Sequence, residues 1–238
     1  MSLVIGNDLR AALGPVRDQG RRATCLAFAA SAVHGHLQGY DGQLCVEWLF
    51  YHAVTRAGDD PADGSTIEDT QAVLRELGQP DEAFWPYQAA EPDPVAWRPP
   101  SGATALFRCI SAYCGGTAAA IRQTLEAGQP LVLGLLVTDA FQGPWRIVEG
   151  EAVLPDDGLP PERRFGHAVV AVGHGTLDGV PHLLIRNSWG QRWGHDGHAW
   201  IAEQDVGRRF LGAFTVQNGV EDGLQSEAAG PHGRTRLA

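Results

Sequence analysis

Three residues far apart in the sequence have side chains that could together perform nucleophilic catalysis. Cys25 begins the apolar part of "DQGRRATCLAFAASAV", His167 stands at the entrance of the apolar run "GHAVVAVGHG", and Asn187 follows the run "HLLIR". The partial positive charge at a helix N-terminus shifts a thiol there toward the reactive thiolate. The sequence therefore offers a nucleophile, a base and an amide that could orient the base, and it predicts an exposed thiolate paired with imidazolium.

The second half of the chain predicts the sheet that would bring His167 and Asn187 together. Turn residues separate the five apolar runs "LVLGLLV", "AVVAVGHG", "HLLIRNSW", "HAWIAEQ" and "FLGAFTVQ", and "LDGV" supplies a hairpin turn between the second and third. Neighbouring antiparallel strands place such positions side by side, so Asn187 can accept a hydrogen bond from one imidazole nitrogen. The other ring nitrogen would then face the thiol.

The first half instead predicts helices, one of which would carry Cys25. "CLAFAASAVHGHLQG" follows Thr24, a candidate N-cap, and "CVEWLFYHAVTR" predicts a second helix. "STIE" at 65–68 has the spacing of a capping box, with Ser65 as the N-cap, and "TAAAIRQTLEAG" predicts one more helix. The Pro-rich segment 79–103 indicates a crossover between lobes, whereas 221–238 has no apolar period and predicts a flexible tail.

Four separated stretches of the chain resemble the papain family of cysteine peptidases, in the family's order. They are "GPVRDQGRRATCLAFAASAV", "STIEDTQAVLRELG" with "WPY" after it, "GHAVVAVGHG" and "IRNSWGQRWGHDGHAWI". The resemblance implies an α+β, papain-like fold of two lobes, with the active-site cleft between a helical lobe and an antiparallel β-barrel-like lobe. We expect the helical lobe over 10–103 and the β lobe over 104–220, which agrees with the order of predicted helices and strands.

The resemblance also implies a role for each candidate residue. Cys25 would be the nucleophile, His167 its general base and acid, and Asn187 the group that orients the imidazole. Gln19 would donate its side-chain amide to the oxyanion, and Trp189 would shield the hydrogen bond between His167 and Asn187 from water. Such a mechanism requires no cofactor and no metal.

A second group of residues would bind the substrate, although each has a simpler explanation. Gly64 and Ser65 could contact the substrate backbone, as a glycine-containing stretch does in the family, while Ser65 could instead only cap a helix. Ile67 and Ala168 could line the pocket for one substrate residue or could simply be buried. Trp189 could be an ordinary core aromatic residue.

The chain departs from the family pattern around the nucleophile. Arg22 stands where the family has a cysteine that usually forms a disulfide, and Ala23, Thr24 and Leu26 replace the family's Gly, Ser and Trp. We therefore expect all four cysteines to be reduced and the protein to be cytoplasmic, or secreted if a leader and a pro-segment were removed. Only 24 residues precede Cys25, so the usual pro-segment is missing from this sequence, whether it was cleaved, left out or never existed. The chain resembles a bacterial-type member without that segment.

Composition excludes several other classes of protein. The 238 residues carry a formal net charge of −10 and all 18 basic residues are arginine, so no basic stripe is available for nucleic acid. No segment has the length or apolar character of a membrane span. The expected partner is a peptide or protein substrate, and no pattern specifies an oligomeric state.

Two other functions remain open at the level of sequence. An amide or acyl transferase on the same fold would use the same four residues, with an amine replacing water in the second step. A non-catalytic binding module would be expected to have lost the nucleophile or the base, and this chain retains both. We therefore place hydrolysis of peptide bonds first.

Overall fold

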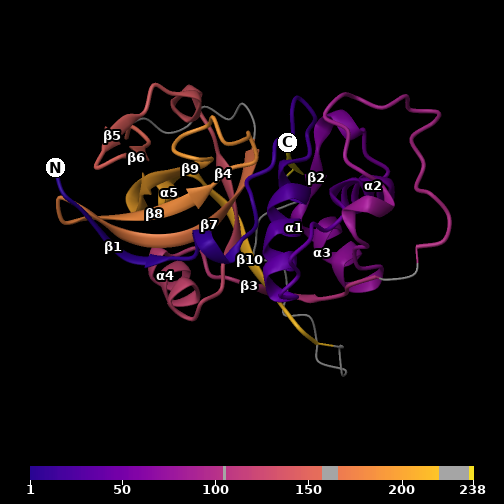
Figure 1. Cartoon of the computed structure of the whole chain (residues 1–238), viewed down its shortest axis with the longest axis horizontal. Coiled ribbons are helices and arrows are strands. Elements are labelled where there is room, and N and C mark those ends of the chain that lie inside the picture. The colour runs from indigo at the N-terminus through magenta and orange to yellow at the C-terminus, as the bar shows by residue number, and fades with distance from the viewer. Residues whose placement is uncertain (104–105, 157–165, 220–235) are drawn as a thin grey trace.

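Three helices in the first third of the chain form one lobe, and a large sheet forms the other (Figure 1). The computed structural model describes residues 1–103, 106–156, 166–219 and 236–238. The helices of the first lobe are α1 (Cys25–Leu37), α2 (Val46–Ala57) and α3 (Ile67–Glu76). The predicted arrangement of helices followed by strands in two lobes is confirmed.

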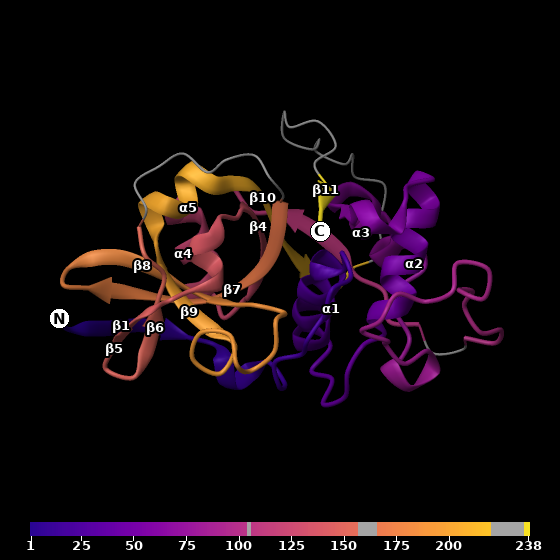
Figure 2. The same cartoon turned by 90° about the horizontal axis from the view of Figure 1, so that it is seen from above.

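α1 lies where the two lobes meet, which explains why it is apolar nearly all round (Figure 2). Its residues pack against the sheet on one side and against α2 and α3 on the other. A helix that is buried on several faces has no polar stripe to present to water. The predicted cap by the Thr24 side chain is wrong, because the Thr24 hydroxyl makes no capping bond and lies 2.8 Å from the Tyr87 hydroxyl.

α2 and α3 both begin with side-chain caps, and at α3 the cap is not the predicted one. Cys45 Sγ accepts a hydrogen bond from the Trp48 N–H at the start of α2. At α3 the N-cap is Thr66, one residue after the predicted Ser65: the Thr66 hydroxyl accepts from the Asp69 N–H at 3.1 Å. Ser65 instead lies in the short strand β2 (Ser65–Thr66), which pairs with another strand at the end of the chain.

The second lobe is built on a nine-stranded sheet, and the predicted mainly antiparallel pairing is confirmed. The strand order is β3-β10-β4-β7-β8-β9-β6-β5, with β1 paired to β7, and of these pairings only β6 with β9 is parallel. The strands are β1 (Leu3–Asp8), β3 (Ile110–Tyr113), β4 (Leu131–Leu136), β5 (Arg146–Val148), β6 (Glu151–Val153), β7 (Gly166–Leu177), β8 (Val180–Arg186), β9 (His198–Ala202) and β10 (Phe210–Gln217). The "LDGV" turn joins β7 to β8, with Asp178 and Gly179 both at positive φ.

Short helices complete both lobes. α4 (Ala118–Glu126) and α5 (Glu203–Arg209) pack on the sheet, and the 3-10 turns are Arg10–Ala12, Pro61–Asp63, Glu82–Phe84 and Asp139–Gln142. α5 and β1 were not predicted from sequence. No helix in the described ranges is long and apolar enough to traverse a bilayer.

The Pro-rich segment 79–103 does not form the predicted crossover between lobes. It wraps the outer side of the helical lobe, where the Trp97 ring packs against Phe50 and Tyr51 (Figure 1). The Trp97 indole N–H donates to Glu47 at 2.6 Å, and Glu47 in turn holds Arg22 through two hydrogen bonds of 2.7 Å. A buried ion pair therefore ties the loop before α1 to α2 and to this segment.

The four cysteines of the chain, Cys25, Cys45, Cys109 and Cys114, are all free and buried. Arg22, at the position where the resemblance implies a disulfide partner, is only 2% exposed. Its guanidinium also lies over the Phe50, Tyr87 and Trp97 rings. Burial alone would lower the pKa of Arg22, but the bonds and charge of Glu47 outweigh it and raise the pKa, so the guanidinium stays charged.

The end of the chain is held between the lobes and not loose as predicted. β11 (Arg236–Leu237), which lies between β10 and α3 in Figure 2, pairs antiparallel with β2, with Leu237 opposite Ser65. Leu237 is fully buried, because its side chain enters the core between α1 and the sheet. The rest of the predicted tail, residues 220–235, lies outside the described residues.

Candidate active site

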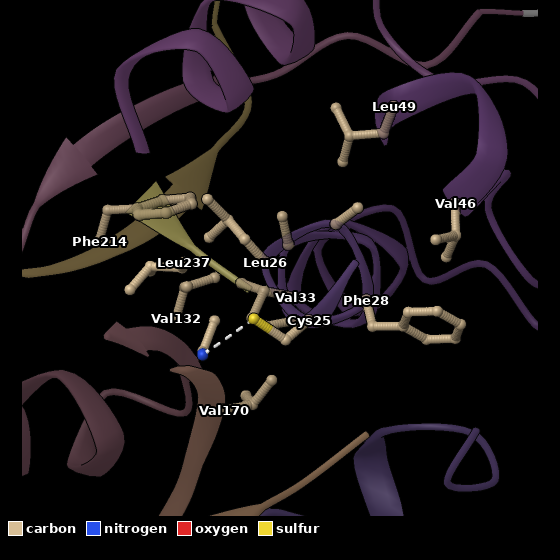
Figure 3. Close-up of a cluster of buried hydrophobic side chains, with 14 of the residues drawn as sticks. Cys25, Leu26, Phe28, Val33, Val46, Leu49, Val132, Val170, Phe214 and Leu237 are labelled. Carbon is tan, nitrogen blue, oxygen red and sulfur yellow. Dashed lines mark hydrogen bonds between the residues drawn. The ribbon is translucent and has the colours of Figure 1, made fainter. Parts of the chain in front are cut away.

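Cys25 is the first residue of α1, and its side chain points toward the sheet (Figure 3). The Ala168 N–H donates a hydrogen bond to its sulfur at 3.2 Å. The predicted exposure of the thiol is wrong in this structure, because Cys25 has 0% of its surface exposed. Burial raises its pKa to about 12, and the backbone N–H groups of Ala168, Leu26 and Cys25 only partly oppose that effect.

His167 and Asn187 lie side by side, as the hairpin pattern predicts. His167 is the second residue of β7 and Asn187 directly follows β8, and the two strands pair antiparallel. The His167 Nε2–H donates to Asn187 Oδ1 at 2.8 Å, and this oxygen also accepts from the Ser188 N–H. The amide therefore fixes both the tautomer and the ring orientation of the imidazole.

The other ring nitrogen of His167 faces the end of the chain. Nδ1 lies 3.4 Å from the Ala238 main-chain oxygen, and the described residues show no hydrogen bond between the imidazole and the Cys25 sulfur. Burial lowers the pKa of His167, although its bonds to Asn187 and Ala238 act in the opposite direction. Cys25 and His167 thus favour their neutral forms in this state of the site.

Trp189 covers the imidazole on one side. Its ring centroid lies 4.7 Å from that of His167, with the two planes tilted by 40°. The Trp193 ring stands perpendicular to Trp189 behind it. This stack keeps water from the buried hydrogen bond between His167 and Asn187, where a low dielectric strengthens the interaction.

Gln19 is buried in the loop before α1, and hydrogen bonds to both its amide nitrogen and its amide oxygen fix its orientation. Its Nε2 donates to the Arg22 carbonyl at 2.8 Å, and its Oε1 accepts from the Ser188 hydroxyl at 2.7 Å. A side-chain amide nitrogen carries two N–H donors, so this bond to Arg22 uses one of them. The second is available to a developing negative charge.

The structure places the five predicted substrate-binding residues in two groups. Gly64 and Ser65 run alongside the last residues of the chain, and a Cβ built on Gly64 would come within 2.1 Å of the Leu237 main-chain oxygen. Ile67 begins α3 and packs beside the hydrophobic core that contains Leu237. Ala168 contacts the nucleophile, as described above, and Trp189 lies on the other side of His167.

A shallow hollow opens next to Trp189, and neither Ser65 nor Leu237 lines it. Its volume is about 420 Å³, and it is lined by Asp18, Gly20, Gln142, Trp145, Trp189, Arg192 and Trp193. A substrate that crosses the site could therefore continue into open space beyond the imidazole. Aromatic rings and a few polar groups of this kind suit a peptide.

Sequence reasoning missed the residues that surround Leu237. A Cβ on Gly134 would lie 3.1 Å from one Leu237 methyl group, and a Cβ on Gly166 would lie 2.6 Å from the other. Gly134 interrupts the apolar run of β4, and a glycine inside a strand often marks the close approach of another group. That signal could have indicated a pocket, but not what fills it.

Comparisons with known proteins agree with this arrangement. A family model described as "Papain family cysteine protease" matches residues 6–208. Cathepsin K of Gallus gallus is 29% identical over 207 residues, which cover 84% of this chain and 59% of that protein. Cathepsin B-like CP3 of Giardia intestinalis is 29% identical over 221 residues, covering 84% of this chain and 69% of that protein.

The fold is likewise similar to that of solved structures. Xylellain, a cysteine protease from Xylella fastidiosa, has a TM-score of 0.70 and 23% identity, and the match covers 92% of this chain and 87% of that one. At this identity the likeness shows the fold. The chain spans 59% of the length of the cathepsin K that it matches, so its activity has to be argued from the site.

Proposed function

The chain belongs to the papain family of cysteine proteases, and from this premise we propose that it hydrolyses peptide bonds with Cys25 as the nucleophile. The observation that carries the proposal is that His167 bonds Asn187 while Ala168, the next residue of β7, bonds the Cys25 sulfur, which places the three side chains at the junction of the lobes. Three elements far apart in sequence supply them: α1, the start of β7 and the end of β8. A thiol, an imidazole and an orienting amide are what acyl transfer through a thioester requires.

The chemistry follows from the placement of these groups. The Cys25 thiolate attacks the substrate carbonyl and forms a carbon–sulfur bond, and imidazolium His167 then gives its proton to the amine as the carbon–nitrogen bond breaks. Water, deprotonated by the same imidazole, attacks the thioester and releases the acid and the thiol. Asn187 acts only through His167, because it holds Nε2 and leaves Nδ1 free for the proton.

The negative charge on the substrate oxygen needs donors that are oriented before the reaction. The unused N–H of Gln19 and the backbone N–H of Cys25, at the start of α1, would supply two of them. The Ser188 hydroxyl keeps the Gln19 amide from rotating. This preorganisation is the reason to place Gln19 in the catalytic machinery.

We place the substrate, a peptide or an unfolded segment of a protein, along a line that crosses the site. Gly64 and Ser65 would bind the backbone of the substrate, and Ile67 and Ala168 would contact one of its side chains. Trp189 would lie beside the part of the substrate that follows the cleaved bond. An edge strand such as β2 pairs readily with an extended peptide. The hollow beside Trp189 leaves room for the residues that follow the cleaved bond.

The decisive experiment identifies the thiol that reacts and links it to turnover. We expect an epoxide reagent to modify Cys25 before the other thiols, and Cys25→Ala and His167→Ala each to abolish cleavage of a fluorogenic peptide. Cys114→Ala, a buried thiol bonded to Thr124 in the sheet lobe, is the matched control and should retain activity. Faster modification of Cys45, Cys109 or Cys114, or turnover by Cys25→Ala, would contradict the mechanism. The full chain and Leu237→Asp should both be assayed, because Leu237 covers the thiol.

We also propose that the protein works in the cytoplasm, where thiols stay reduced. Its four cysteines are free, and an ion pair occupies the region in which the resemblance implies a disulfide. Secreted proteins of this size commonly gain stability from disulfides. Titration of the denatured, unreduced protein from its host should yield four thiols per chain, and fewer would argue against this compartment.

A further inference from the structure

The last three described residues lie in the site as an extended peptide held by both lobes. On one side Leu237 and Arg236 pair with Ser65 and Thr66 of β2. On the other side the Ala238 N–H donates to the Gly166 carbonyl at 3.1 Å. Gly166 directly precedes His167, so this bond brings the Ala238 backbone to the catalytic residues, with its oxygen 3.4 Å from His167 Nδ1.

The Leu237 side chain fills a pocket that is dry and closely fitted. It has 0% of its surface exposed and belongs to the core cluster that contains Cys25, Val132 and Phe214 (Figure 3). Two glycines, Gly134 and Gly166, make the room, because a Cβ on either would approach the leucine methyl groups to 3.1 Å or less. A side chain buried in this way contributes binding energy in proportion to its apolar surface.

Arg236 adds charge complementarity at the outer end of the same peptide. Its guanidinium pairs with Asp63 at 2.8 Å and also with Asp59. Both carboxylates belong to the loop that leads into Gly64 and β2, so the acidic pair and the edge strand bind successive parts of one ligand. Three independent contacts thus fix the register: an ion pair, a leucine pocket and a backbone bond beside the base.

The catalytic pair is in an unreactive state while this peptide lies in the site. The Cys25 thiol has no exposed surface, and burial raises its pKa to about 12, which favours the neutral thiol over the thiolate. His167 directs its remaining nitrogen at Ala238. Neither group is poised for attack while the peptide is in place.

We propose that Arg236–Ala238 is a built-in competitive ligand. It occupies the part of the site that binds the substrate residues before the cleaved bond, and it must leave before the enzyme can act. The acidic pair Asp59 and Asp63 also sets a substrate preference: a basic residue directly before the residue whose side chain fills the Leu237 pocket. This inference rests on the proposed peptidase function. It goes beyond that function because it assigns both a control element and a substrate preference to named contacts.

Three residues can occupy the site because they belong to the same chain as the site. A ligand on the same chain competes at an effective concentration that can reach the millimolar range, so modest intrinsic affinity suffices. A substrate can still displace it, because a longer peptide also gains contacts in the hollow beside Trp189, which the tripeptide does not line. The site would therefore open in response to substrates that use both sides.

The first test measures access to the nucleophile and needs no substrate. The rate of Cys25 alkylation by iodoacetamide at pH 7 is compared between the original chain, Leu237→Asp and Arg236→Glu. We expect Leu237→Asp to react on the order of 10- to 100-fold faster, the factor that burial of one leucine implies. Arg236→Glu, which faces Asp59 and Asp63 with a like charge, should react about threefold faster or more.

Arg146→Glu on β5 is the matched control, with the same change of charge on an exposed residue of the other lobe. It should react as slowly as the original chain. Should Leu237→Asp fail to fold, as judged by circular dichroism, Arg236→Glu decides, because its side chain is at the surface. Adding the peptide acetyl-Arg-Leu-Ala to the faster variants should restore slow labelling in a concentration-dependent way. Equal rates in the original chain and both tail variants would overturn the proposal.

The second test uses fluorogenic peptides and separates this inference from the proposed function. With acetyl-Arg-Leu-Ala on the reporter, kcat/KM should rise by the same factors in the tail variants. Replacing leucine in the peptide by aspartate should cost at least tenfold, and replacing arginine by glutamate about threefold or more. Equal turnover in the original and the tail variants would refute the inference and leave the peptidase standing. Faster labelling without cleavage of any peptide would keep the tail contact and refute the peptidase.

Discussion

The buried ion pair between Arg22 and Glu47 allows a sharp prediction about stability. The two side chains are 1% and 3% exposed and make two hydrogen bonds of 2.7 Å. Glu47→Gln keeps the shape of the side chain but removes its charge. The guanidinium of Arg22 would then be buried with Glu91 as its remaining counter-charge, and Glu91 lies 3.9 Å away with a largely exposed side chain.

The size of the effect follows from what remains unpaired. Breaking a buried pair by neutralising one partner costs about 3–5 kcal/mol, because the other charge stays desolvated. The Trp97 N–H can still bond the glutamine oxygen, so the loss of that bond does not add to the cost. A double variant, Arg22→Met with Glu47→Leu, removes both charges together. The double variant avoids the isolated charge, although it leaves the Trp97 N–H and the Gln88 carbonyl without partners, at about 1–3 kcal/mol each.

Urea unfolding at pH 7, followed by tryptophan fluorescence, measures these free energies. Glu76→Gln is the matched control, because Glu76 bonds Arg56 at 2.6 Å but both side chains are more than 40% exposed. Exposed pairs contribute about 0–1 kcal/mol. If Glu47→Gln costs no more than Glu76→Gln, then Arg22 is not the structural replacement for a disulfide that we infer.

Three further predictions concern the oxyanion donor, its orientation and pH. Gln19→Ala should lower kcat/KM by about 10²–10³, and full activity would mean that the oxyanion is bound elsewhere. Ser188→Ala, which only frees the Gln19 amide to rotate, should lose about two- to tenfold in the same assay, and a loss as large as that of Gln19→Ala would contradict a positioning role. Burial, followed by the charge of Arg186, lowers the pKa of His198 to about 4 from 6.5. Between these values the unfolded chain binds a proton that the folded chain does not, so unfolding free energy should fall by up to about 3 kcal/mol as pH drops from 6.5 to 4. His198→Gln should flatten that decline, and an unchanged pH dependence would refute the assignment.

The pairing of His167 with Asn187 could be predicted because it depends on local chain geometry. A hairpin signalled by "LDGV" joins two apolar runs, and antiparallel pairing then brings the start of one beside the end of the other. The helix that carries Cys25 was equally visible, as an apolar segment of the right length. Contacts that depend on one hairpin or one helix are encoded within a few residues, and the sequence shows them.

Other features depend on contacts between distant segments and could not be predicted. The local pattern predicts Ser65 as the N-cap of α3. Because Ser65 pairs with β11 as part of a strand, Thr66 caps the helix instead. The segment 79–103 lacks a period because Trp97 anchors it through Glu47, a residue of α2. The burial of Cys25 has the same origin. A thiol at a helix N-terminus suggests exposure only as long as nothing else in the chain covers it.

The glycines around Leu237 are visible in the sequence, but the contact that requires them joins distant segments of the chain. Gly64, Gly134 and Gly166 come from three separate parts of the sequence, and each lacks the one carbon atom that would collide with the end of the chain. The substitution Gly134→Ala would place a methyl group 3.1 Å from Leu237, a contact that requires the leucine to shift. Such a shift would weaken the tail and a leucine-containing substrate alike, since both occupy the same space. Gly134→Ala should therefore speed alkylation of Cys25 relative to the original chain. In the Leu237→Asp background, where the tail is already displaced, Gly134→Ala should lower kcat/KM for the Arg-Leu-Ala peptide. Only a pocket shared by tail and substrate predicts both effects of one added methyl group.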